Sequence, residues 1–278
     1  MSASVFLIVL FAAALHATWN AIVKSGDDKF LTTILVTSGA GLVGAVVLPF
    51  VPAPAAASWP FIAASLVLQV VYFVLVASAY RIADMSQAYP LMRGTAPLLV
   101  AMASASLFGE QLSALAWVGI CVLCAGIASL AWSGRSGGHA KGIGLALANA
   151  VVIAGYTLID GAGVRRSGAP IAYAAWLFLL TALPLAGWAL VAKGAAFRRY
   201  AAANLHLGLI GGIGTVGSYG LALWAMTLAP VAVVAALRET SILFATAIAA
   251  LVLKERVSRG RIAAVGVIAM GAALLRLA

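Results

Sequence analysis

Three charged residues stand inside long apolar runs of a chain that carries few charges. Arg93 lies in the run 86–108, and Arg238 and Glu239 lie in the run 230–253. A charge near the middle of a membrane-spanning helix costs about 3 kcal/mol on insertion scales, so it must face a polar cavity or an opposite charge. We interpret both arginines as cations that attract an anionic group of a substrate. The alternative is that each arginine holds helices together.

Glu239 is the one carboxylate that the sequence places deep within an apolar run. Removal from water favours the neutral form of a carboxyl group, so such a group can exchange protons near neutral pH. Glu239 is therefore a candidate for proton coupling. Alternatively, it pairs with an arginine of another helix. A pair with Arg238 itself is unfavourable because adjacent helix residues point apart.

Polar and aromatic residues at helical spacing mark further faces of apolar runs. In the first run, His16, Asn20 and Lys24 are four residues apart, and Trp19 lies between them. Such a face points into a helix bundle, where it lines a pathway or forms hydrogen bonds between helices. His16 is equally a structural histidine, and Trp19 an interfacial anchor. The other candidates are Gln69, Tyr72, Tyr89, Asn149, Tyr156, Asp160, Thr215 and Tyr219.

Several other kinds of site are excluded. The pattern Gly212-Ile-Gly-Thr-Val-Gly217 lies inside an apolar run, whereas a dinucleotide fingerprint follows a strand. Gly208 and Gly212 instead form a G-x-x-x-G face for close helix packing. Cys121 and Cys124 have no neighbouring ligands, so we predict no metal site and no cofactor. The sequence also contains no P-loop and no set of residues for nucleophilic catalysis, so we do not expect an enzyme.

The composition shows where these residues must lie. Apolar residues make up 64% of the 278 residues and charged residues only 9%, against roughly 25% in soluble proteins. The net charge of +10 comes mainly from short loops, which favours contact with lipid head groups over nucleic acid. Ten runs reach the length of about 20 residues that a spanning helix needs. They are 3–23, 30–50, 60–82, 86–108, 113–132, 142–162, 169–192, 204–228, 230–253 and 260–277.

The chain shows an internal repeat. A shift of 145 residues places Arg93 on Arg238 and Glu110 on Glu255. Both glutamates lie just before a predicted helix, where the helix dipole favours a carboxylate, so we interpret them as structural. Five helices per half is an odd number, so the second copy begins on the opposite side of the membrane. We predict an all-α membrane protein of two inverted five-helix repeats, 1–132 and 142–278, joined by a central loop at 133–141.

The motifs AYPLMRGTAPLLV and VAALRETSILF, on ten spans arranged five plus five, resemble the drug/metabolite transporter superfamily and its EamA-type ten-helix branch. The resemblance implies a secondary transporter, monomeric or homodimeric, in the inner membrane of a bacterium. It would move a small anionic or zwitterionic metabolite, such as an amino acid, organic acid or phosphonate, by alternating access. The alternatives are a flippase for an anionic lipid-linked intermediate and an intramembrane enzyme.

Loop charges predict the orientation. Apart from Arg93 and Arg238, twelve basic residues fall in the odd-numbered loops and only three in the even-numbered loops and C-terminal end. Short basic loops stay in the cytoplasm, so the count places both termini outside. The three are Arg165, Arg166 and Arg276; the twelve are Lys24, Lys29, Arg81, Arg135, Lys141, Lys193, Arg198, Arg199, Lys254, Arg256, Arg259 and Arg261.

Overall fold

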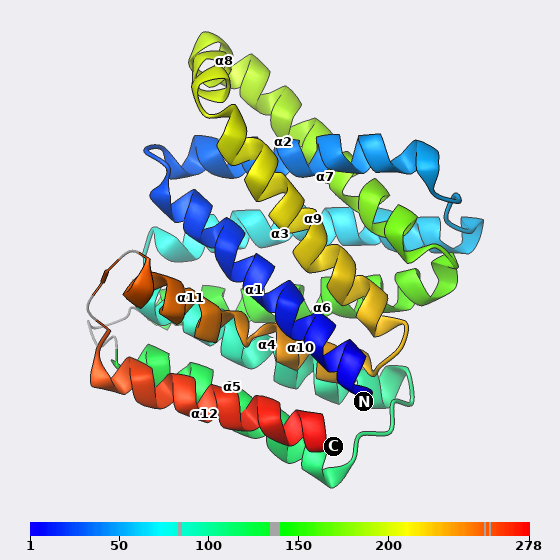
Figure 1. The fold of residues 1–278 in the computed structure, drawn as a ribbon, viewed down its shortest axis with the longest axis vertical. Coiled ribbons are helices and arrows are strands. Elements are labelled where there is room, and N and C mark those ends of the chain that lie inside the picture. Colours follow the sequence, from blue (N-terminus) through cyan, green and yellow to red (C-terminus); the bar gives the residue numbers. More distant parts are fainter. Residues whose placement is uncertain (83–84, 134–139, 253, 256) are drawn as a thin grey trace.

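The computed structural model describes residues 1–82, 85–133, 140–252, 254–255 and 257–278, which are almost entirely helical (Figure 1). Residues 134–139 of the predicted central loop, with Arg135 and Ser136, lie outside the described residues, and so does Arg256. The helices are α1 (Ala3–Ser25), α2 (Lys29–Val47), α3 (Trp59–Tyr80), α4 (Met85–Leu107), α5 (Ala114–Ser133), α6 (Ala140–Ser167), α7 (Pro170–Ala192), α8 (Gly194–Ala203), α9 (Leu205–Met226), α10 (Val231–Arg238), α11 (Ser241–Leu251) and α12 (Arg259–Leu277). Two 3-10 turns, Leu48–Phe50 and Ala56–Ser58, lie between α2 and α3.

Helices occupy each of the predicted apolar runs. Within the described residues, eight segments are long and apolar enough to cross a membrane, and α5 contributes a shorter apolar helix, Ala114–Leu130. Helix α4 is 23 residues long but contains Arg93, Pro90 and Pro97. The all-helical membrane class is confirmed, whereas the count of ten spans stays a prediction.

The structure corrects the prediction at 230–253, which is not one helix. It divides into α10 and α11 at Glu239 and Thr240 (Figure 1). Here the amide groups donate to carbonyls three residues back, and the Thr240 hydroxyl donates to the Leu237 carbonyl at 2.6 Å. A hydroxyl that bonds its own backbone competes with the helical pattern. The short helix α8 was not predicted either.

Helices of the two halves of the chain are interleaved. Helix α12 packs against α5, α2 against α7, α3 against α6, and α1 against α9. The predicted G-x-x-x-G face fits this packing. A Cβ atom on Gly39 of α2 would collide with the Gly208 carbonyl of α9, and one on Gly212 would collide with the Gly39 backbone. These glycines let α2 and α9 approach to backbone contact.

Contacts between chain ends and loops define two opposite faces. On the first, which we call the terminal face, the Arg276 guanidinium donates to the Met1 carbonyl at 3.2 Å. The Ala55 amide donates to Ser167 on that face. On the opposite face, Lys24 pairs with Glu255 at 2.6 Å. Since the two termini share one face (Figure 1), the chain crosses between the faces an even number of times.

Candidate functional site

Arg93 and Glu239 form a two-pronged ion pair between α4 and the α10–α11 junction. The Nε atom of Arg93 donates to Oε2 of Glu239 at 2.8 Å, and the Nη2 atom of Arg93 lies 2.8 Å from Oε1. The side chains are 10% and 7% exposed, respectively. The Nε contact is a charge-assisted hydrogen bond, whereas the Nη2 contact is close but lacks hydrogen-bond geometry. The structure thus gives Glu239 the alternative role considered above, as partner of an arginine on another helix.

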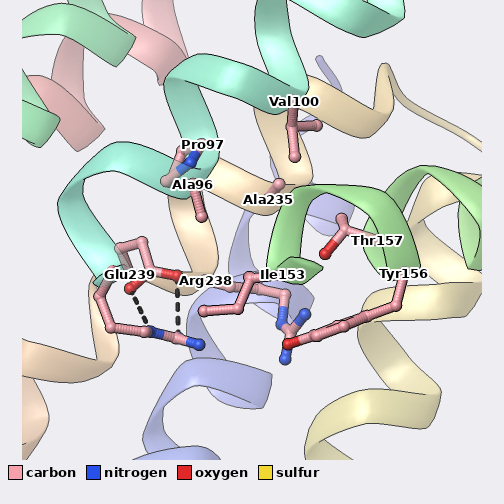
Figure 2. A pocket seen from close by; sticks show the side chains of 10 residues that line it. Ala96, Pro97, Val100, Ile153, Tyr156, Thr157, Ala235, Arg238 and Glu239 are labelled. Atoms are coloured by element: carbon pink, nitrogen blue, oxygen red, sulfur yellow. Dashed lines mark hydrogen bonds and ion pairs between the residues drawn. The ribbon is translucent and has the colours of Figure 1, made fainter. Parts of the chain in front are cut away.

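Arg238 is placed differently from Arg93. It is the last residue of α10, and its guanidinium carbon lies 4.7 Å from the ring centroid of Tyr219. Figure 2 shows the guanidinium beside Tyr156. No ion pair or hydrogen bond joins the Arg238 side chain to any described residue. Its charge is therefore not matched by a contacting carboxylate.

Both arginines line one small pocket between α4, α6 and α10 (Figure 2). One part of its wall is polar, with two guanidinium groups, a carboxylate, a phenol and a hydroxyl. The rest is formed by small apolar side chains. The pocket thus brings two cationic groups next to apolar surface. The lining residues are Arg93, Ala96, Pro97, Val100, Ile153, Tyr156, Thr157, Ala235, Arg238 and Glu239.

Tyrosines predicted for the site lie around this pocket. Tyr72 and Tyr156 meet edge to face, with ring centroids 6.1 Å apart. Tyr219 lies under Arg238. Tyr89 is close enough to Arg93 for the two to interact electrostatically. Only Tyr156 of these four is a lining residue.

Four further predicted residues, Trp19, His16, Asn20 and Gln69, bond to neighbours on their own helices. The Trp19 indole donates to Nδ1 of His16 at 3.3 Å, and the Asn20 amide donates to the His16 carbonyl at 2.7 Å. The Gln69 amide donates to Ser65 at 3.3 Å. His16 is nonetheless within electrostatic reach of Arg93 and Arg238. None of these four residues lines the pocket.

A second polar centre surrounds Asp160, one of the polar candidates on the sixth apolar run. Its carboxylate is fully buried and accepts hydrogen bonds from the hydroxyls of Tyr173, at 2.9 Å, and Tyr219. Asp160 follows Tyr156 by four residues, and this spacing in the sequence already placed both residues on one face of the helix. Tyr173, in an apolar run of α7, gave no such signal.

Comparison with known proteins is consistent with these features. Residues 140–277 match the model of the EamA-like transporter family. The second half of the chain belongs to this family. The family is part of the drug/metabolite transporter superfamily, as the sequence motifs implied, so the protein is a multi-pass membrane transporter of that type.

Several solved structures share the fold of this transporter, and one crystal structure illustrates the likeness. It superposes with a TM-score of 0.77 at 23% identity, covering 100% of this chain and 99% of the other. The comparison with curated proteins gives no match.

Two further ion pairs of the transporter join its halves at opposite faces. On the terminal face, Arg165 of α6 bonds Glu110 at 2.8 Å and also donates to carbonyls of Met226 and Ala229. Glu110 also accepts from the Val231 amide at 2.9 Å. We expected this carboxylate to interact with the dipole of the helix that follows it in the sequence, but the bonds that it makes are to other helices. Glu110 contacts the start of α10 in the other half, because the α4–α5 and α9–α10 loops meet there.

Proposed function

We propose that this protein is a secondary transporter that moves a small anionic or zwitterionic metabolite across the inner membrane by alternating access. The observation that supports this most is the position of Arg238. It is a guanidinium at a helix break, facing a pocket, with no contacting carboxylate. A cation at such a depth is costly unless a partner arrives. A carboxylate or phosphonate group of a solute is the matching partner, because a guanidinium binds both with two parallel bonds.

The arrangement around the arginines supports an inverted repeat. Under the shift of 145 residues, Pro97 corresponds to Ile242, four residues after each arginine. Pro97 has no amide hydrogen, and the Ile242 amide donates to Glu239 rather than to Arg238. Both arginines therefore lie where the helical bonding pattern is interrupted. Discontinuous helices at the interface of inverted repeats commonly form substrate sites.

The ion pairs at the two faces support alternating access. Glu110 and Glu255 correspond under the same shift, and their partners Arg165 and Lys24 end α6 and α1, the first helix of each predicted repeat. Each pair joins residues 1–132 to residues 142–278. The Arg165 pair is reinforced by backbone bonds, whereas the Lys24 pair is exposed. When the transporter changes state, we expect the Lys24 pair to become reinforced and the Arg165 pair to become exposed.

Uptake into proteoliposomes tests the proposed function. A thermal-shift screen of amino acids, organic acids and phosphonates first selects the solutes that stabilise the purified protein. Arg238→Gln should reduce uptake of a selected anion by at least about tenfold, because it removes a charged partner in a poorly solvated site. Arg199→Gln, on the exposed surface of α8, is the matched control and should transport normally. Undiminished uptake by the Arg238 variant would contradict the proposal.

A further inference from the structure

Asp160 differs from the other buried carboxylate in its partners. Glu239 is bound at both oxygens by Arg93. Asp160 is held by hydroxyl groups alone, since none of the ion pairs among the described residues includes it. A buried carboxylate held only by hydroxyls can become neutral without leaving a cation unpaired. Protonation of Glu239 would leave Arg93 buried without its partner.

Tyr219 connects Asp160 to the pocket. Its hydroxyl donates to Oδ2 of Asp160, and the face of its ring lies under the Arg238 guanidinium. The carboxylate and the unpaired cation are thus separated by one aromatic ring. The polar groups that interact with Asp160 come from its own helix and from four others. They are Ser65 of α3, Tyr156 of α6, Tyr173 of α7, Tyr219 of α9 and Arg238 of α10.

The buried charges around the pocket sum to zero when both arginines are charged and both carboxylates are ionised. Arg93 and Glu239 cancel in direct contact, and Arg238 and Asp160 cancel at longer range. An anion that binds Arg238 makes the interior negative by one charge. Uptake of one proton by Asp160 restores neutrality. Because charges interact strongly in a medium of low dielectric constant, the two events favour each other, and this coupling is reciprocal.

We propose that Asp160 takes up the proton that accompanies an anionic solute through this transporter. The inference rests on the proposed binding of the anion by Arg238. The proton passes from water to a carboxylate oxygen of Asp160, and no other bond forms or breaks. The new O–H group then donates to the oxygen of Tyr173 or Tyr219, whose hydroxyls can rotate from donor to acceptor. Release of the anion returns the proton to water.

Calorimetry in buffers of different ionisation enthalpy counts the protons taken up on binding. The probe is an anion that stabilises the wild-type protein in the thermal-shift screen. The wild type should take up about one proton per anion above the pH at which Asp160 ionises. Asp160→Asn carries the neutral form permanently. It should therefore bind the anion at least as tightly as the wild type, take up almost no proton, and lose the pH dependence of binding.

Matched variants separate this role from a structural one. Glu255→Gln removes an exposed carboxylate and should leave the proton count unchanged. Tyr173→Phe removes one donor to the Asp160 carboxylate and should extend proton uptake to higher pH, which a purely structural Asp160 would not do. If Asp160→Asn does not fold, the pH shift of Tyr173→Phe still tests the proposal.

Two results would overturn the inference: a wild type that binds the anion without proton uptake, or an Asp160→Asn variant that still takes up the proton. Failure of the proposed function is distinguishable, because the anion would then bind equally well after Arg238→Gln.

Discussion

The ion pair between Arg93 and Glu239 should contribute strongly to stability, and Glu239→Gln tests this. Both Arg93 prongs lie 2.8 Å from Glu239 oxygens, and at most a tenth of either side chain is exposed. Removal of one partner leaves a guanidinium buried among helices. Breaking such a pair costs about 3–5 kcal/mol. We therefore expect Glu239→Gln to lower the free energy of unfolding by about 3 kcal/mol, measured by reversible unfolding in mixed micelles.

Glu255→Gln is the matched control, because it makes the same chemical change in the Lys24 pair. That pair is 56% and 42% exposed, and exposed pairs contribute about 0–1 kcal/mol. The double variant Arg93→Met, Glu239→Gln should recover much of the lost stability, since no charge then remains unpaired. Equal effects of Glu239→Gln and Glu255→Gln, or strict additivity in the double variant, would refute the reasoning.

Two further predictions concern packing and orientation. Gly39→Ala should destabilise the protein by about 1–3 kcal/mol in the same unfolding assay, because its Cβ meets the Gly208 backbone. Gly144→Ala meets no atom and should be neutral or slightly stabilising; equal effects would disprove the backbone contact. A cysteine at Asp27, in a cysteine-free background, should resist an impermeant thiol reagent in intact cells, whereas one at Ala57 should react. The reverse pattern would place the termini in the cytoplasm.

The sequence predicted the helices well because length and apolarity define a membrane-spanning run. It did not predict the break at Thr240, which depends on one hydroxyl competing for the Leu237 carbonyl. It did not predict α8 either, because α8 is short and amphipathic. Hydropathy finds long apolar runs, but it does not find a short amphipathic helix between them.

The arginines of the site could be predicted, but their partners could not. Arg93 and Arg238 stood out because charges are costly in apolar runs. The pair of Arg93 with Glu239 spans 146 residues and depends on how two helices are rotated about their axes. Tyr173 looked like one more apolar residue, although its hydroxyl holds Asp160. The two arginines, equivalent in the sequence repeat, differ because position 94 is glycine where position 239 is glutamate.

The most direct test of alternating access is the accessibility of the pocket from each side of the membrane. Thr157 lines the pocket and is almost fully buried. A cysteine at this position, in a cysteine-free protein, can be treated with an impermeant thiol reagent in vesicles of either orientation. We predict that the reagent modifies this cysteine from both faces. A transported solute at saturating concentration should change the rate of modification from each face. Reaction from one face only, or from neither, with and without solute, would contradict the account.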